Sequence, residues 1–330
     1  MKKNIIALAI ASAIAAPVAM ADAPTVYGQI NVSMDSAKDM GQFTSDRDSR
    51  VGVKGSEDLG NGLKAVYQME FGVSVGNAYA MSGRNAVVGL GGSFGTVLLG
   101  RHDSPLKMSQ AKDLFGDATY ADMGKKQLMG QLGYGKKNGE IRFDNVVAYV
   151  SPEFAGIKIV AAGVGAENGT NDASLTNAYS IAAMYGSTKE GLYLAAAMDH
   201  ADEQIAGATD EEWNHLRLSA QYATGGLVAN VTYQDFKDGS SVKSSDEGTN
   251  IQVNVGYKMG AFMPKAKYSM TDSAVKANKD GSAYALGLDY SFGKKTTGYV
   301  EYMAADKKMG VLSGVNDDFN VVSVGMVHKF

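Results

Sequence analysis

The sequence of 330 residues has no cysteine, which excludes a disulfide framework, a thiolate metal site and a cysteine nucleophile. It has four histidines, and no two of them stand at the spacing of a metal-binding pair, so a zinc hydrolase is not expected. Walker and complete dinucleotide-binding sequences are missing too, and we therefore predict neither a metal nor another cofactor. Only 5 prolines stand beside 40 glycines, 17 tyrosines and 11 phenylalanines, a composition that favours extended, turn-rich chain over helix.

Long hydrophobic runs are also missing, apart from one near the N-terminus. There, two lysines precede an apolar run over residues 5–18, and a small-x-small sequence ends at Ala21. This arrangement is typical of a secretory signal peptide, and we predict that residues 1–21 form one. A run of about 14 apolar residues is too short to span a bilayer as a helix. The mature chain, residues 22–330, would carry 29 basic and 35 acidic side chains, which disfavours nucleic acid as a partner.

Alternation of apolar and polar residues recurs along the whole mature chain. In residues 250–258, isoleucine, valine and tyrosine alternate with asparagine, glutamine and glycine, and residues 283–292 show the same period of two. Successive side chains of a β-strand point to opposite faces, so each such segment would have one apolar face and one polar or small face. The mean hydropathy of the chain, −0.15, is near neutral because the two faces cancel in the average.

Sixteen such segments can be counted, an even number, as in single-chain bacterial barrels. They begin near Thr25, Ser49, Leu63, Arg84, Thr96, Ile141, Ile157, Asn177, Leu192, Trp213, Leu227, Thr249, Phe262, Ser282, Thr296 and Asp318. Short connections with glycine alternate with long polar stretches, among them residues 35–48, 201–212, 237–247 and 307–317. We therefore predict an all-β fold, a 16-stranded antiparallel transmembrane β-barrel that forms a single domain over residues 22–330. A soluble β-sandwich would give no reason for this strand number or loop rhythm.

The C-terminal segment is the most specific single feature. Residues 320–330 alternate and end in Phe330, which shares a face with His328, Met326 and Val324. A C-terminal strand that ends in phenylalanine looks like the assembly signal of bacterial outer-membrane proteins. We therefore assign that role to Phe330.

Five stretches of the sequence together form a recognisable pattern. They are SRVGVKGSEDLGNGLKAVYQMEFG at residues 49–72, GRNAVVGLGGSFGTVLLGR at 83–101 and RFDNVVAYVSPEFAGIKI at 142–159, together with the opening TVYGQINVS and the closing VGMVHKF. These stretches resemble the general porins of Gram-negative bacteria. The resemblance covers essentially the whole mature chain. It implies a homotrimer in the outer membrane, in which each subunit encloses a water-filled pore for passive diffusion of small hydrophilic solutes and ions. It also implies that the third extracellular loop, residues 102–140, folds inward and narrows the pore.

The resemblance further implies a constriction with a basic wall that faces acids on the loop. By motif match, Arg50, Arg84 and Arg142 would form the wall, with Arg101 at the base of the loop. Alternation independently puts Arg50 and Lys54 on one face of their strand. The facing acids would come from the loop, namely Asp113, Asp117 and Asp122. Which of them faces the arginines stays open, because the proline-glutamate-phenylalanine tip of enteric members is absent from this loop.

The charge balance of the loop predicts its selectivity. Between residues 102 and 140, six lysines outnumber four aspartates and one glutamate, so the loop and the arginine wall together are basic. Charges at the narrowest point should dominate, because a Debye length of about 8–10 Å screens the distant loops. We predict a weak preference for anions.

Further expected partners are outer-membrane lipids, lipopolysaccharide and the outer-membrane assembly machinery.

Other functions are less consistent with the sequence. Two G-x-S-x-G sequences, at residues 72–76 and 91–95, do not open a helix after a buried strand, as a nucleophile elbow must, so we do not expect an enzyme. A substrate-specific channel would need aromatic residues along the lumen, whereas the predicted inner faces carry Gln, Asn, Ser, Gly and charges. A surface adhesin would be a barrel with a plugged lumen. Both of these barrels stay open as alternatives.

Overall fold

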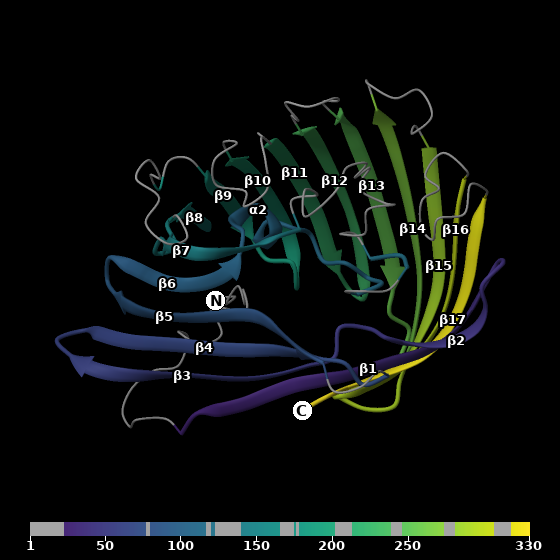
Figure 1. Cartoon of the computed structure of the whole chain (residues 1–330), viewed down its shortest axis with the longest axis horizontal. Helices are drawn as coiled ribbons and strands as arrows, with labels where there is room; N and C mark the ends of the chain where they lie inside the picture. The colour runs from purple at the N-terminus through teal and green to yellow at the C-terminus, as the bar shows by residue number, and fades with distance from the viewer. Residues whose placement is uncertain are drawn as a thin grey trace.

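The computed structural model describes residues 23–76, 80–116, 120–122, 140–165, 175, 178–201, 213–238, 246–273, 281–306 and 318–330. Its strands form one antiparallel sheet that closes on itself (Figure 1). The predicted signal peptide, residues 1–21, lies outside the described residues. Where the chain is described, it contains no helix of the length and apolar character needed to cross a membrane.

The described part of the chain contains seventeen strand elements and a short helix, α2 (Pro105–Met108). The strands are β1 (Thr25–Ala37), β2 (Gly41–Asp46), β3 (Arg50–Gly60), β4 (Leu63–Val73), β5 (Met81–Gly92), β6 (Gly95–Asp103), β7 (Arg142–Val150), β8 (Ile157–Val164), β9 (Ala178–Gly186), β10 (Gly191–Ala201), β11 (Trp213–Thr224), β12 (Leu227–Asp238), β13 (Asp246–Tyr257), β14 (Phe262–Ser273), β15 (Gly281–Ser291), β16 (Thr296–Ala305) and β17 (Phe319–Lys329). Apart from β2 and β3, which both pair with β1, each strand pairs with its neighbour in the chain. β17 returns to pair with β1, side by side in Figure 1.

The elements β2 and β3 together occupy one position in the barrel. β2 pairs with residues 32–37 of β1, and β3 pairs with residues 25–29 of the same strand. The barrel therefore has 16 strand positions, and the predicted fold is confirmed. The long loop predicted over residues 35–48 is wrong, because most of that stretch belongs to β1 and β2. Its strand residues are mostly polar, so the apolar half of the alternation is missing there.

The two faces of the sheet differ in the way that the alternation predicts. On β13 the apolar side chains Ile251, Val253 and Val255 are exposed on the outside, whereas Gln252 and Asn254 are completely buried inside the barrel. The same pattern holds on β17, where Val322 and Val324 are exposed and Ser323 is buried. This arrangement is the reverse of that in a soluble protein, and it suits a barrel whose outer surface faces lipid.

Aromatic side chains gather on the outer face near the short turns. Phe262 and Phe292 both pack edge-on against Tyr290, with ring centroids 4.9 Å apart in each pair. Phe330 continues the pairing of β17 with β1, because its backbone exchanges hydrogen bonds with Gly28 at 3.2 and 3.1 Å. A side chain at Gly28 would lie 2.6 Å from the Phe330 ring, so the terminal ring needs a glycine there.

A buried ion pair holds the junction between β2 and β3. Arg47 lies in this junction, and its Nη2 is 2.7 Å from Oδ1 of Asp35 on β1. Asp35 is fully buried and also accepts hydrogen bonds from Ser33 and Ser45. Arg47 in turn donates to Ser33 at 2.8 Å and to Ser323 on β17 at 3.3 Å, so it joins the first, second and last barrel positions.

We expect Asp35→Asn to destabilise the barrel by about 3 kcal/mol, because it removes the buried carboxylate that lies 2.7 Å from the Arg47 guanidinium. Urea unfolding in lipid vesicles, followed by the fluorescence of Trp213, would measure the loss; this is the single tryptophan of the chain. The matched control is Asp39→Asn in the exposed turn after β1, which should leave the midpoint unchanged. Equal midpoints for the two variants would contradict this role of the ion pair.

Candidate charged site inside the barrel

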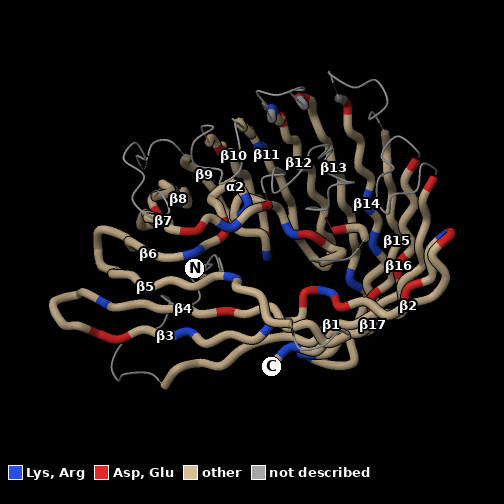
Figure 2. The backbone as a smooth tube through the Cα atoms, in the orientation of Figure 1, with Lys and Arg blue, Asp and Glu red and all other residues tan. Residues whose placement is uncertain are grey.

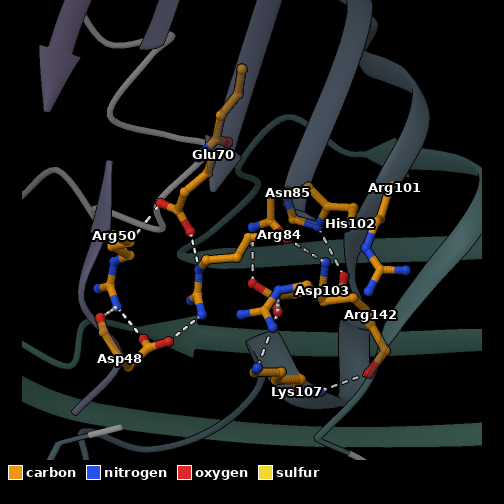
Figure 3. A network of polar contacts seen from close by, with 12 residues as sticks. Asp48, Arg50, Glu70, Arg84, Asn85, Arg101, His102, Asp103, Lys107 and Arg142 are labelled. Atoms are coloured by element: carbon orange, nitrogen blue, oxygen red, sulfur yellow. Dashed lines mark hydrogen bonds and ion pairs between the residues drawn. The ribbon is translucent and has the colours of Figure 1, made fainter. Parts of the chain in front are cut away.

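Three arginines and three carboxylates form a network on the inner face of the first barrel strands. Figure 2 shows basic and acidic residues interspersed along β3 to β6, and Figure 3 shows the side chains. Arg84 donates from Nε to Glu70 at 2.5 Å and pairs through Nη1 with Asp48. Arg50 pairs with the same two acids, with Asp48 through Nη1 and with Glu70 at 3.8 Å. The two arginines thus share two carboxylates.

Asp103 is the centre of the second half of the network. Its Oδ1 lies 3.1 Å from Nε of Arg142 on β7 and 3.1 Å from Nζ of Lys107 on α2 (Figure 3). Asn85 donates from Nδ2 to the other carboxylate oxygen at 2.9 Å. Asp103 thus holds Arg142 and Lys107 together at the base of the loop. The sequence analysis did not assign a role to this acid.

A β-bulge explains how Arg84 reaches the network. The pairing of β4 with β5 shifts between Met69 and Phe71, so Arg84 and Asn85 both lie opposite Glu70. Strict alternation would have put Arg84 on the outer face, with the exposed Val88. The bulge instead directs two consecutive side chains inward. It is also the reason why the sequence around Arg84 alternates poorly.

The other two predicted basic residues lie apart from this network. Arg101 continues the outward-facing set of β6, after the exposed Val97 and Leu99, and pairs with the half-exposed Asp144. The structure therefore does not bring Arg101 to the other arginines. Lys54 does share the inner face with Arg50, as predicted, but its ammonium lies over the Tyr27 ring, 5.1 Å from the centroid.

The chain that leaves β6 lies against the inner face of the opposite strands. The helix α2 begins with an N-cap, because Ser104 accepts from the Lys107 amide at 3.1 Å, and with Pro105 at its first position. Ser180 on β9 accepts from the Leu106 amide at 3.0 Å. Tyr193 on β10 donates to the Ser109 carbonyl at 3.0 Å. We call residues 104–116 the inner segment.

The inner segment continues across β11 and β12 in the same way. The backbone amide of Lys112 donates to Gln221 on β11, and its carbonyl accepts from Asn230 on β12, both at 2.9 Å. The completely buried Arg217 donates to the Leu106 carbonyl at 3.3 Å. Polar side chains of the barrel wall therefore hold the backbone of the segment without any strand pairing.

Two lysines of β14 hold the end of the inner segment. Lys267 pairs with Asp113 at 2.7 Å and donates to the Ala121 carbonyl, and Lys265 donates to the Leu114 carbonyl at 2.8 Å. Both ammonium groups lie over the ring of Phe115, at 4.6 Å for Lys265 and 5.3 Å for Lys267. Alternation along β14 would have put both lysines inside, but nothing in the sequence indicates that they meet the loop.

The structure describes two of the three predicted loop acids. Asp113 is bound to Lys267, on the wall opposite the arginines, and Asp122 is half-buried. Asp117 lies outside the described residues, as do four of the six loop lysines, Lys125, Lys126, Lys136 and Lys137. Three acids that were not predicted, Asp48, Glu70 and Asp103, pair with Arg50, Arg84 and Arg142.

A cavity of about 530 Å³ lies between the inner segment and the wall formed by β14 to β17 and β1, with Arg50 at its edge as the one network arginine in its lining. Its lining includes six basic residues, Arg50, Lys107, Lys265, Lys294, Lys295 and Lys329, and three acidic ones, Asp113, Asp289 and Glu301. The cavity is therefore basic on balance. No group of three or more metal-binding side chains occurs among the described residues.

The family is decided by a comparison with known protein families. The model of the family described as Gram-negative porin matches residues 7–310. The chain belongs to the Gram-negative porins. It is thus an outer-membrane β-barrel of a Gram-negative bacterium, a water-filled channel through which small hydrophilic solutes and ions diffuse, and the predicted family and location are confirmed.

Known porins resemble the chain over its full length. The major outer membrane protein P.IB of Neisseria lactamica is 28% identical to it, and the alignment covers 100% of both chains. The anion-selective porin from Comamonas acidovorans has the same fold, with a TM-score of 0.75 and 22% identity, over 93% of this chain and 99% of that one. The trimer form of OmpT from Vibrio cholerae has a TM-score of 0.68 and 18% identity, over 94% and 100% of the two chains.

We expect Lys267→Met to loosen the inner segment of this porin, because it removes the charge-assisted bond to Asp113. A bond to a charged group contributes about 1.5 kcal/mol, so the backbone amides of residues 113–115 should exchange about tenfold faster. Hydrogen–deuterium exchange of the purified protein, read by mass spectrometry, measures this rate.

The matched control is Lys64→Met on β4. Among the described residues Lys64 has no ion pair with the inner segment, so the same loss of charge should leave the exchange rate unchanged there. Unchanged exchange in the Lys267 variant as well would contradict the role of Lys267 as an anchor.

Proposed function

We propose that this porin passes small hydrophilic solutes and ions without energy input, with a weak preference for anions. Its narrow section would lie between a basic wall, formed by Arg50, Arg84 and Arg142, and the inner segment, which contributes Lys107. The observation that carries the proposal is the lining of the cavity between Arg50 and the inner segment, in which basic residues outnumber acidic ones by six to three. Rings of arginine and lysine favour anions in channels.

The ion pairs of the wall make the proposed preference weak. Four cations, those of Arg50, Arg84, Arg142 and Lys107, stand against the three carboxylates of Asp48, Glu70 and Asp103. Each carboxylate is shared by two cations, so the network keeps one excess positive charge. A single net charge in a water-filled passage is screened within about 8–10 Å. The likeness of the fold to an anion-selective porin agrees with the proposed sign of the preference.

The proposed constriction differs from the one that the resemblance implies. We propose that the acids next to the arginines come from the barrel strands and their ends, while the loop acid Asp113 serves to anchor the inner segment through Lys267. In this arrangement the inner segment narrows the pore. A solute in the passage would then meet positive charge from both sides. Arg101 would take no part, because it lies on the outer face.

We also propose that three copies assemble in the membrane. The trimer form of the Vibrio cholerae protein, whose fold is alike, supports this assembly. The exposed apolar side chains of the outer face would contact the neighbouring copies and outer-membrane lipids, with lipopolysaccharide at the outer leaflet. Phe330, exposed beside the outer face of β1, would be the residue that the assembly machinery recognises.

Two other functions fit the described residues less well. A substrate-specific channel would align aromatic rings along the passage, whereas Tyr193 and Tyr299 are buried and donate hydrogen bonds to Ser109 and Asn31. An adhesin would fill its lumen, whereas a cavity of about 530 Å³ lies beside the arginines. We propose that the protein acts as a channel and catalyses no reaction, in keeping with its family.

Removal of two wall charges tests the proposed selectivity. In water a unit charge about 4 Å away contributes about 1 kcal/mol, so Arg50→Ala with Arg142→Ala should lower the chloride-to-potassium permeability ratio several-fold. The ratio follows from the reversal potential of the protein in a planar bilayer under a potassium chloride gradient. The difference in permeability ratio between the double variant and the wild type should shrink at high salt, because salt screens the charges of the wall.

Arg101→Ala is the matched control for this experiment. It removes the same side chain from the neighbouring strand, but from the outer face, and should leave the permeability ratio unchanged. An effect of Arg101→Ala as large as that of the double variant would contradict the proposed wall, and so would a double variant with the ratio of the wild type.

A further inference from the structure

Three lysines gather where the barrel closes, at the end with the short turns. Lys294 and Lys295 lie in the turn between β15 and β16, and Lys329 is the last residue of β17. All three line the basic cavity. Short turns lie on the periplasmic side of such barrels, so this group marks the periplasmic mouth.

The strand register puts two of these lysines directly opposite each other. The backbone amide of Lys329 donates to the carbonyl of Lys295 at 2.8 Å, in line with the pairing of Thr297 with Val327 further along. All four of these residues line the cavity, so the two lysine side chains share the inner face. Like charges in directly opposed positions repel and destabilise a strand pair. An anion between them would remove that cost.

A lysine of the inner segment, Lys112, adds positive charge to the surroundings of Lys329. The backbone of Lys112 is fixed on both sides by Gln221 and Asn230. Burial, and then the positive charges of Lys329 and Lys258, lower the pKa of the Lys112 ammonium. Lys112 and Lys258 therefore belong to the electrostatic surroundings of Lys329.

The carboxylates of the cavity are committed to other partners. Asp289 and Glu301 pair with Lys265 at 2.7 and 2.8 Å, and Asp113 pairs with Lys267 at 2.7 Å. Lys294, Lys295 and Lys329, by contrast, have no ion pair with any residue that the structure describes. The positive charge at this mouth is therefore not compensated by the acids that line the same cavity.

We propose that Lys294, Lys295 and Lys329 form a binding station for multivalent oxyanions of the phosphate type. A doubly charged oxyanion offers several acceptor oxygens to ammonium groups of different elements, whereas chloride carries one charge on a single atom. The station does not include Arg50, although Arg50 lines the same cavity. It rests on the proposed function only in that its anions would travel through the same lumen.

The test is calorimetric titration of the purified trimer in detergent with inorganic phosphate at pH 7.5, against sodium chloride at equal ionic strength. The wild type should bind phosphate saturably and show no saturable chloride binding. Lys295→Gln with Lys329→Gln should weaken phosphate binding at least tenfold, and Lys294→Gln, in the turn outside the strands, should weaken it as well. Lys189→Gln, an exposed lysine in another short turn, is the control and should bind as the wild type does.

Two results would overturn the station. One is a wild type without saturable phosphate binding, and the other is a set of lysine variants that all bind as tightly as the wild type. The reversal potential in potassium chloride separates this inference from the proposed function. An anion-preferring channel that fails to bind phosphate would remove the station alone, whereas a cation-preferring channel that binds phosphate would remove the proposed selectivity alone.

Discussion

The structure depends on one constraint, the pairing of every backbone N–H and C=O group in a surrounding that offers no water. A closed antiparallel sheet meets this constraint because it has no edge. Here the closure runs from Gln29 opposite Lys329 to Ala37 opposite Val321, and the backbone of Phe330 extends it to Gly28. Closure also decides where side chains go, because each strand then has one face toward lipid and one toward the lumen. The near-neutral mean hydropathy of the chain follows from that division.

A polar interior adds a second requirement, because its charged groups must be hydrated or paired and must be held in position. The barrel solves it with shared carboxylates: Glu70 and Asp48 each serve two arginines, and Asp103 serves Arg142 and Lys107. On the far wall, Lys265 and Lys267 use their charges to hold the inner segment. Among the described residues, the lumen thus contains many charges, most of them in ion pairs. The weak discrimination between ions that we propose follows from this pairing.

Much of the fold could be predicted from the sequence, because strand alternation is a local property. It gave the strand positions, the closed barrel and the inward direction of Arg50 and Lys54. It failed at β2, whose polar sequence looks like a loop, and at Arg84, where a bulge reverses the direction that alternation gives. It could not reveal that Asp113 meets Lys267, since 154 positions separate them in the sequence. Contacts between a loop and a distant strand depend on closure, and no local pattern encodes them.

We infer that each subunit encloses an open passage with a basic narrow section, and that three subunits act together. Single-channel recording of the purified wild-type protein in a planar bilayer tests both statements. We expect long-lived open steps that arrive in groups of three equal levels, and a reversal potential under a potassium chloride gradient with the sign of preferred chloride permeation. A membrane without open steps, or a reversal potential with the sign of preferred potassium permeation, would contradict this inference.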